Sequence, residues 1–377
     1  MAPSAPTTEA DVAIIGAGPA GTAAAAHLGE LGVRRVVLVD RHDFPRDKTC
    51  GSAVSPKGIE VLKDLGVWED VEPHAYGITG IRLVTPGGRE SWQSAGGTAE
   101  AIVCKRRVLD KILLDKALKR GTTFVPHFDA AEAIEEDGRM VGFRSRDGRE
   151  VRAKLVMIAG GSHCRVGLPE LRPRRTIQAI MGWWKDVDFR PHHVEMIFDR
   201  AIEPYYGWLF PEGDEIVNIG ITYQDPPDGK RLNARKLFQD FLDRQYGQRL
   251  KGATRVGPLK GHPIVWSYAI EKLTAPGRIV IGEAGLMTHP ATAEGIYQGM
   301  YSGMLGAGAA ADILRGGQSE ELAFARYERA CRKAYRSSFL AGGFFLNLIK
   351  TDVLDWMVAL TDLPVVKSGT AKLMAKM

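Results

Sequence analysis

The first forty residues alternate between apolar and small-residue segments in an order typical of strand, turn, helix and strand. Residues 11–15 form a short apolar run, residues 16–21 read Gly-Ala-Gly-Pro-Ala-Gly, and an alanine-rich segment follows. Residues 36–39 are again apolar and are closed by Asp40. Because buried parallel strands read as continuous apolar runs, this order predicts the opening of an α/β domain.

The spacing of the glycines in this turn predicts a dinucleotide site. Gly16 permits the tight turn, Gly18 lets the backbone approach a pyrophosphate, and Gly21 lets the helix lie close to the sheet. Asp40 stands where a carboxylate accepts a ribose hydroxyl, which disfavours a 2′-phosphate. FAD or NAD therefore suits the site better than NADP, and these residues leave open which of the two binds. A loop that only turns the chain would leave Asp40 unexplained.

Periodicity along the rest of the chain predicts a β-rich insertion in this first domain. Helices are expected at about 55–65, 105–120 and 232–246, in an alanine- and glycine-rich segment after residue 282, and from Ser319 onwards. Strands are expected at 78–84, 101–104, 130–135, 140–144, 151–158 and 278–282, and most of 176–222 is a β pattern rich in aromatic residues.

The predicted fold class is therefore α/β, with a discontinuous Rossmann-like domain, an inserted β-rich domain and a helical C-terminal region. The Rossmann-like domain is expected to comprise residues 1–70, 101–172 and 273–318. The β-rich domain is expected to comprise 71–100 and 173–272, and the helical region 319–377.

A second motif, at residues 282–296, separates FAD from NAD. A strand ends in Gly282-Glu283, and a loop containing Pro290 leads into a helix near Gly295. A flavin needs an acid for its ribityl hydroxyls and a helix N-terminus near the N1–C2 carbonyl, where charge builds on reduction. NAD needs neither, so the pair of motifs favours FAD.

Composition and charge indicate which partners, metal sites and membrane segments are not expected. Apolar residues make up 45% and charged residues 25% of the chain, and the net charge is +5 with scattered cations, so nucleic acid is not an expected partner. The four cysteines have no metal-ligand spacing, which indicates a reduced, cytoplasmic chain without a metal site. No run reaches the ~20 apolar residues of a membrane span. Residues 1–10 are polar and are expected to be a loose tail rather than a signal sequence.

With these motifs in view, the chain resembles the geranylgeranyl reductase family of FAD-dependent oxidoreductases, within the p-hydroxybenzoate hydroxylase-like superfamily of monooxygenases and halogenases. The resemblance extends to about Gly308. It is carried by the two glycine motifs, by Arg-x-Lys-x-Cys-Gly at 46–51, by Arg107-x-x-Asp110, and by Tyr-Gly-Trp-Leu-Phe-Pro at 206–211 followed by Asn218-Ile-Gly220.

The resemblance implies a set of site residues. Cys50 would lie beside the isoalloxazine, Arg107 would contact the flavin, and Tyr206 and Trp208 would border the substrate cavity. His289 would be the histidine near the flavin, although a plain loop histidine is the commoner reading. The cofactor-binding residues that it implies are Gly16, Gly18, Ala20, Gly21, Asp40, Arg41, Cys50, Gly51, Arg107, Gly160, Glu283, Pro290, Gly295 and Ile296.

Three short segments depart from the family pattern and indicate a specialised member. Glu283 stands where the family usually has Asp. Gly160 stands where the family has the Asp of an Ala-Asp-Gly run, and Ala293 stands where it has a glycine near the expected flavin. A longer acid still reaches a ribityl hydroxyl, so FAD is expected to remain.

The implied activity is hydride transfer to or from a carbon–carbon bond of a hydrophobic molecule, taken from a membrane or from a carrier protein. No second dinucleotide motif is present, so NAD(P)H would act transiently at the flavin, or a reduced carrier would replace it. A C4a-hydroperoxide monooxygenase is the main alternative. A halogenase is disfavoured because the WxWxIP motif and a lysine between 63 and 105 are missing. A prenyl-binding chaperone without flavin is disfavoured because both halves of a flavin site are present.

Overall fold

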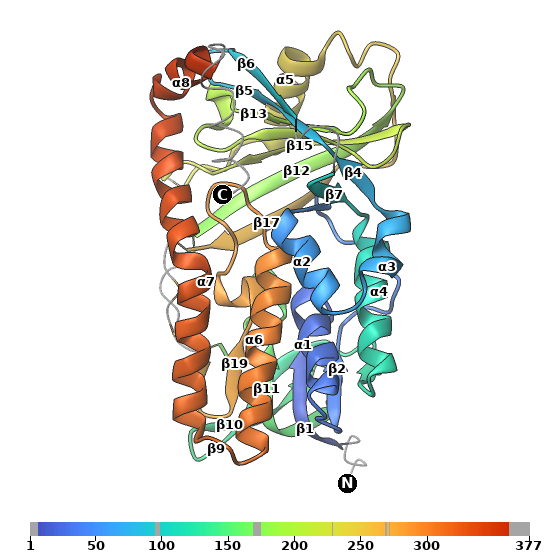
Figure 1. Cartoon of the computed structure of the whole chain (residues 1–377), viewed down its shortest axis with the longest axis vertical. Helices are drawn as coiled ribbons and strands as arrows, with labels where there is room; N and C mark the ends of the chain where they lie inside the picture. The colour runs from blue at the N-terminus through green and yellow to red at the C-terminus, as the bar shows by residue number, and fades with distance from the viewer. Residues whose placement is uncertain are drawn as a thin grey trace.

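The protein consists of two lobes stacked along its long axis. The computed structural model describes residues 7–94, 99–168, 175–227, 229–267, 270 and 272–361. In Figure 1 the lower lobe contains a mainly parallel sheet beside a layer of helices, and the upper lobe contains a second, mainly antiparallel sheet. Helix α7 (Glu320–Ile349) runs along one side of both lobes, and α8 (Val353–Thr361) lies at its upper end.

The lower sheet has the strand order β18-β19-β11-β1-β2-β8. Its five parallel members are β19 (Arg278–Val280), β11 (Glu150–Ile158), β1 (Thr7–Ile15), β2 (Val36–Val39) and β8 (Thr123–Val125), and β18 (Thr274–Ala275) pairs antiparallel with β19. Side chains alternate along β1, so Val12 and Ile14 pack under the helices while Ala13 and Ile15 pack on the opposite face.

Helices cover one face of this sheet. They are α1 (Pro19–Glu30), α4 (Arg106–Lys119), α6 (Ile296–Leu314) and α7. The closest approach is between α1 and α6, where a Cβ on Gly303 would lie 2.4 Å from the carbonyl oxygen of Ala20. The two helix N-termini therefore lie side by side at the upper edge of the sheet (Figure 1).

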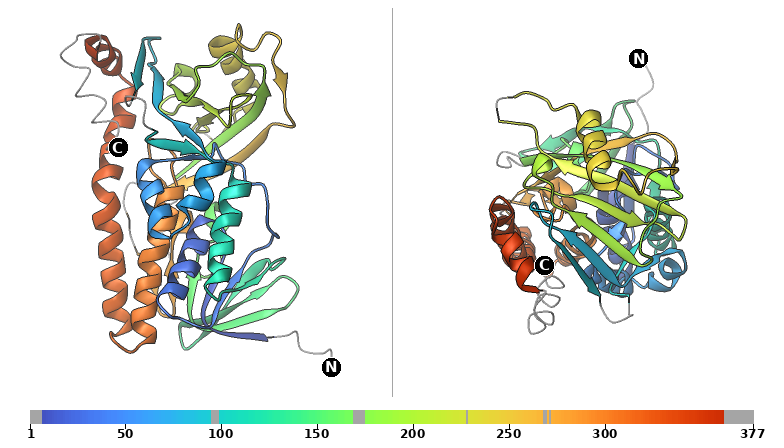
Figure 2. Two further views of the ribbon diagram at one scale, coloured as in Figure 1. Left: turned by 45° about the vertical axis from the view of Figure 1, so that its right-hand side comes forward. Right: turned by 90° about the horizontal axis from the view of Figure 1, so that it is seen from above.

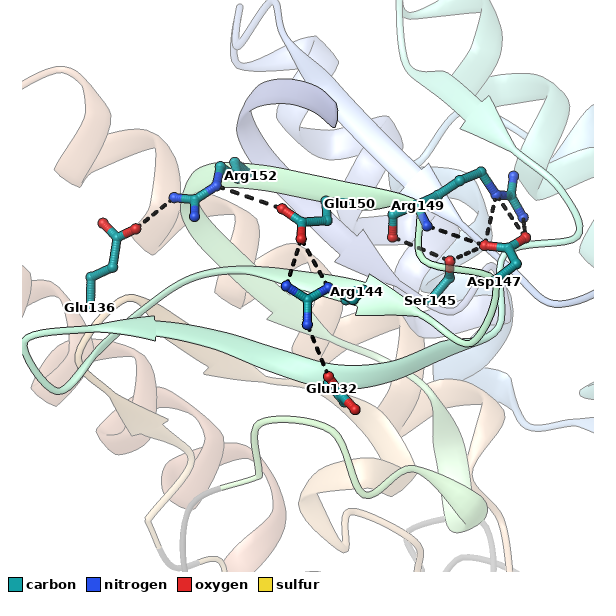
Figure 3. Close-up of polar contacts among 8 residues, drawn as sticks. All are labelled: Glu132, Glu136, Arg144, Ser145, Asp147, Arg149, Glu150 and Arg152. Atoms are coloured by element: carbon teal, nitrogen blue, oxygen red, sulfur yellow. Dashed lines mark hydrogen bonds and ion pairs between the residues drawn. The ribbon is translucent and has the colours of Figure 1, made fainter. Parts of the chain in front are cut away.

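The other face is covered by a hairpin of β9 (Ala130–Glu136) and β10 (Arg139–Ser145), which pairs with the first half of β11. Its outer surface carries the ion pairs of Figure 3, in which Arg144 bridges Glu132 and Glu150 and Arg152 reaches Glu136. Exposed pairs of this kind contribute little stability each. This surface is a solvated wall away from the cavity described below.

The upper sheet has the order β16-β12-β15-β14-β13-β5-β6, with β17 also paired to β12. The strands are β5 (Gly80–Val84), β6 (Glu90–Ser94), β12 (Arg175–Lys185), β13 (His193–Ile197), β14 (Gly207–Pro211), β15 (Ile216–Tyr223), β16 (Thr254–Arg255) and β17 (Lys260–Trp266). Helix α5 (Ala234–Tyr246) covers the outer face through Phe238 and Phe241. The inner face turns toward the lower lobe.

Short elements join the lobes. They are β3 (Ala53–Val54), α2 (Pro56–Asp64), α3 (Trp68–Val71), β4 (Tyr76–Ile78) and β7 (Ala101–Val103), with 3₁₀ turns at Glu72–His74, Gly161–His163, Arg200–Ile202 and Gly282–Gly285. Strands β3, β7 and β4 form a separate three-stranded sheet.

The α/β class, the discontinuous Rossmann-like domain and the helical C-terminal region are confirmed. The helices predicted at 55–65, 105–120 and 232–246 are α2, α4 and α5, each to within two residues. The prediction of a loose tail to Ala10 is wrong from Thr7 onward, because β11 extends far enough to pair with residues 7–10. The strand expected at 278–282 ends at Val280, since Gly282 turns with φ +62°. Part of the predicted helical region, 362–377, lies outside the described residues, and the domain boundaries stay a prediction.

Candidate functional site

A cavity of about 980 Å³ lies between the two lobes, at the upper end of the range for ligand pockets. Its wall runs from the N-terminus of α1, past the 46–55 loop and the inner face of the upper sheet, to the N-terminus of α6 and the middle of α7. Thirteen of the predicted site residues line it: Gly16, Gly18, Ala20, Asp40, Arg41, Cys50, Gly51, Gly160, Tyr206, Trp208, Glu283, Gly295 and Ile296. Gly21, Arg107, His289 and Pro290 do not.

The glycines at the start of α1 have the conformations that their spacing predicts. Gly16 has φ +99°, and a Cβ there would lie 2.6 Å from the Ala159 carbonyl oxygen. A Cβ on Gly21 would lie 1.9 Å from the Gly16 carbonyl oxygen. At Gly18 the nearest atom to a Cβ would be Arg46 Nη2 at 3.9 Å, so this backbone is open toward the cavity.

Two helix N-termini face the cavity without a side-chain cap. Gly18 caps α1 and Gly295 caps α6, and neither helix has a side chain bonded to its first-turn amides. First-turn N–H groups have no intrahelical acceptor, and the helix dipole favours negative charge beside them. A pyrophosphate at α1 and the N1–C2 edge of a flavin at α6 match these two positions, so the residues present fit FAD.

Asp40 ends β2 beside the glycine turn. Its Oδ2 accepts a hydrogen bond from Ala17 N at 2.8 Å and its Oδ1 accepts one from His42 N at 2.9 Å. The carboxylate is thereby fixed at the rim of the cavity, where the adenosine ribose of a dinucleotide bound at α1 is expected.

Glu283 joins three segments of the cavity wall. Its Oε2 accepts from Ser162 N and its Oε1 from Val265 N, both at 3.2 Å. Burial raises the pKa of this carboxyl, and the charge of Lys48 opposes that shift. Each oxygen retains a free lone pair on the cavity side, so Glu283 both braces the wall and presents an acceptor where a ribityl chain is expected.

Lys48, Ser162 and His262 form a polar cluster that the sequence did not indicate. Lys48 Nζ lies 2.6 Å and Ser162 Oγ 3.0 Å from His262 Nε2. An ammonium only donates, so Nε2 is the acceptor and the imidazole carries its proton on Nδ1. Burial lowers the pKa of Lys48 to about 8, and burial followed by the Lys48 charge lowers the pKa of His262 to about 3.

The structure places Arg106, and not Arg107, at the cavity. Arg106 is buried. Its Nε donates to Asp110 Oδ1 at 2.7 Å, and its Nη2 donates to Asp110 Oδ2 at 2.8 Å. It also hydrogen-bonds to Cys50. Arg107 is exposed on the next position of α4. Arg107 therefore does not line the cavity, whereas Arg106 does, because the buried carboxylate of Asp110 one turn later holds Arg106 inward.

The aromatic strand β14 forms the roof of the cavity. Tyr206, Trp208 and Phe210 point inward in succession, with ring centroids 6.2 and 6.0 Å apart. A Cβ on Gly51 would meet the Phe210 ring at 3.1 Å, so the Cys50–Gly51 loop lies directly against this strand. Tyr206 Oη donates to the Thr292 carbonyl at 2.5 Å and joins the roof to the α6 loop.

His289 and Pro290 lie behind the cavity wall. The Nδ1 atom of His289 accepts from Ala291 N at 3.3 Å and Thr292 N at 3.2 Å, while Nε2 donates to the Ser338 carbonyl at 3.2 Å. Burial lowers the pKa of the imidazole to about 4. Both ring nitrogens are occupied by backbone groups, so His289 positions the loop before α6.

Glu294 is an acid in the cavity wall that the sequence reasoning passed over. It directly precedes the Gly295 cap of α6 and hydrogen-bonds through its side chain to Ser55 and Gln298. Its Oε1 atom is shielded from solvent and has no hydrogen-bond partner among the described residues. Burial raises the pKa of this carboxyl, which favours the protonated form.

Comparison with known proteins agrees with this architecture. The sequence profile of the FAD binding domain family matches residues 9–202. Digeranylgeranylglycerophospholipid reductase 1 of Methanothermobacter thermautotrophicus is 29% identical over 98% of this chain and 95% of its own. Menaquinone reductase of Mycobacterium tuberculosis is 30% identical over 79% and 76%.

Solved structures carry the same fold. A geranylgeranyl bacteriochlorophyll reductase-like protein of Thermoplasma acidophilum superposes with a TM-score of 0.86 at 22% identity, over 98% of this chain and 96% of that one. Flavin-dependent halogenases also share the fold.

The family match, the reductase relatives and the cavity together define a two-lobed FAD-binding oxidoreductase. Within that class the chain belongs to the FAD-binding geranylgeranyl reductase family. It is accordingly an FAD-dependent enzyme. Among the helices of the described residues, none has the length and apolarity needed to cross a bilayer.

Proposed function

We propose that this enzyme transfers hydride between FAD and a carbon–carbon double bond of an isoprenoid lipid. The observation that carries the proposal is the aromatic roof of β14, which faces the Cys50–Gly51 loop and the N-terminus of α6 across one cavity. An apolar chain is sheltered there from water, and bound FAD supplies the hydride chemistry. The names of the lipid and menaquinone reductases among the relatives support the same substrate class.

The residues proposed to hold FAD divide into two groups. Gly16, Gly18, Asp40 and Arg41 hold the nucleotide half of FAD, and Glu283, Gly295 and Ile296 hold the flavin half. Further contacts to the cofactor are proposed for Ala20, Cys50, Gly51, Gly160 and Arg106.

Reduction of a double bond also requires a proton, and we assign its delivery to Glu294. The carboxyl lies beside the α6 cap, its Oε1 is unpaired, and Ser55 orients the group. A protonated, partly desolvated acid is suited to general-acid catalysis. Cys50, hydrogen-bonded to Arg106, is proposed to pack against the flavin edge.

The electron donor is proposed to be NAD(P)H bound transiently at the cavity mouth, or a reduced carrier. Arg41 and Arg165 lie among the lining residues and provide positive charge for an anionic donor. The lipid is proposed to arrive from a membrane rather than on a carrier protein, for the reasons given in the next section.

Anaerobic photoreduction of the purified, FAD-loaded enzyme tests the proposal. Addition of a lipid bearing geranylgeranyl chains should reoxidise the flavin without O2 and reduce one carbon–carbon double bond of the lipid per reduced flavin. A product that forms only with O2, together with a long-lived C4a adduct, would support the monooxygenase instead. A protein that stays colourless after reconstitution with FAD would contradict both.

The Glu294→Gln variant tests the proton assignment. Photoreduction should be unaffected, while reoxidation by the lipid should slow by about 10²–10⁴-fold, the usual contribution of a general acid. Glu294→Asp is the matched control and should recover part of the rate. If Glu294→Gln reoxidises at the wild-type rate, the proton comes from another group.

A further inference from the structure

Five large apolar side chains are exposed together where α7 meets α8. Phe344 and Trp356 are each 70% exposed, Leu340 is 54%, Val353 45% and Met357 39% exposed. These five residues are called the α7–α8 patch below. The other exposed large apolar residues are dispersed: Trp92 on β6, Leu118 on α4, Leu232 before α5, Val256 after β16 and Leu322 at the start of α7. A group of such residues on one surface marks an interaction site more often than single exposed residues do.

The outward direction of the patch is fixed by contacts on the inner side. On α7, Phe339, Leu346 and Ile349 are buried, which leaves Leu340 and Phe344 one turn apart on the outer face. On α8, the Asp355 carboxylate accepts from Thr85 Oγ1 and, at 3.0 Å, from Gly87 N in the β5–β6 turn.

Leu354 and Val358 complete the inner face of α8 and pack with the upper sheet. Trp356 and Met357 are consequently held outward. Figure 2 shows the end of α7 and α8 at the periphery of the molecule, beside the upper sheet.

The outer face of α7 before the patch is basic. Arg329, Lys333 and Arg336 are exposed and form no ion pair with a described residue, whereas Arg332 pairs with Glu328 at 3.6 Å. Residues 329–350 contain no aspartate or glutamate. Asp352, an exposed acid that precedes α8, is paired with Arg200 at 2.9 Å.

A helix that is basic along one stretch and apolar with a tryptophan at its end has the pattern of an interfacial membrane segment. Aromatic and aliphatic side chains enter the headgroup region, while cations are drawn to anionic headgroups. A second copy of the chain is a poorer partner, because two such faces would bring like charges together.

The same helix lines the cavity from its other side. Ala334, Tyr335 and Ser338 belong to the cavity wall and lie within two turns of the patch. Docking of the patch would therefore bring the membrane surface close to the site of reaction.

We infer that the α7–α8 patch docks the enzyme on the surface of an anionic lipid bilayer. The inference rests on the proposed function only in naming the bilayer as the source of the substrate. The docking itself is measurable without turnover.

Flotation of the FAD-loaded full chain with phosphatidylcholine vesicles, with and without 30 mole per cent phosphatidylglycerol, tests the inference. Binding should require the anionic lipid and should weaken as salt rises from about 0.05 to 0.5 M, because the attraction is screened. The double variant Phe344→Ser, Trp356→Ser should bind at least about tenfold more weakly. A triple variant should lower vesicle binding and remove most of its salt dependence; its substitutions are Arg329→Gln, Lys333→Gln and Arg336→Gln.

Leu322→Ser is the matched control, because Leu322 is 59% exposed on the same helix outside the patch. It should bind as the wild type does. Equal flotation of the control and the double variant would overturn the inference, as would an absence of binding to anionic vesicles. So would a sedimentation experiment in which the double variant converts a dimer to a monomer, which would identify a second copy as the occupant.

Reoxidation of photoreduced enzyme by the lipid in detergent separates the two proposals. The double variant should react there at the wild-type rate. Loss of vesicle binding with retained reaction supports docking and function together. Vesicle binding without any reaction in detergent contradicts the proposed substrate and leaves the docking inference supported.

Discussion

Trp208 and Gly220 lie opposite each other on β14 and β15, and the indole occupies the space that a side chain at position 220 would need. A Cβ on Gly220 would lie 2.2 Å from Trp208 Cζ2. The indole Nε1 donates to Asn218 Oδ1 at 2.7 Å, and Asn218 Nδ2 donates to the Gly182 carbonyl at 3.1 Å. Asn218 therefore fixes the indole of Trp208 by a hydrogen bond, and Gly220 leaves the space that the indole fills.

Gly220→Ala should displace Trp208 and lower the free energy of unfolding by about 1–3 kcal/mol, the usual cost of overpacking. Denaturant unfolding followed by tryptophan fluorescence measures both effects. Gly308→Ala is a suitable control, because a Cβ at that helical position meets nothing within 4 Å, and it should leave stability equal or slightly higher. Equal stability of Gly220→Ala and wild type would show that the indole has another position available.

Glu283→Ala should weaken FAD binding by about tenfold or more. The carboxylate braces Ser162 and Val265, and its loss also leaves their amides unpaired, which typically costs 1–3 kcal/mol per group. Titration of the apoprotein with FAD, followed by quenching of flavin fluorescence, gives the dissociation constant. Glu150→Ala, at the start of β11 among the ion pairs of Figure 3, provides the comparison and should bind FAD normally. Unchanged affinity in Glu283→Ala would reject its ribityl role.

His262 makes stability depend on pH in a defined direction. Its pKa is about 3 in the folded chain against 6.5 for the ordinary group, so between these values the unfolded chain binds a proton that the folded chain does not. Stability therefore falls as pH decreases from 6.5 toward 3. The His262→Gln variant should lose stability less steeply in this window, by about 0.5–1 kcal/mol per pH unit once solvent screening is included. Guanidinium unfolding at several pH values measures the two slopes, and parallel slopes would contradict the assignment.

Ala293→Gly should stabilise the protein by up to about 1 kcal/mol. Ala293 has φ +54°, a left-handed conformation that costs an L-residue roughly 1–2 kcal/mol, offset in part by the greater entropy of unfolded glycine. Thermal unfolding of Ala293→Gly and of wild type measures the change in stability. Ala291→Gly, at a buried position of the same loop, is the control. The control should be destabilised, and a decrease in both variants would show that the Ala293 methyl contributes packing that outweighs the strain.

The nucleotide end of the site could be predicted from sequence because its constraints are local. Gly16, Gly18 and Gly21 act within one turn, and the alternation of Tyr206, Trp208 and Phe210 follows from the period of a strand. The choice between Arg106 and Arg107 depended on which one faces inward, and the spacing of Arg106 to Asp110 was the available signal. No local pattern joins Lys48 to His262, which are more than two hundred residues apart, because only the docking of the two lobes brings them together.

The cavity wall combines the end of β1 and the start of α1 with Ala334, Tyr335 and Ser338 of α7. During synthesis the glycine turn leaves the ribosome first, while the helix that closes the opposite wall emerges some three hundred residues later. We therefore expect FAD to bind late in the maturation of this enzyme, because a nascent chain arrested before α7 would lack one wall of the cavity.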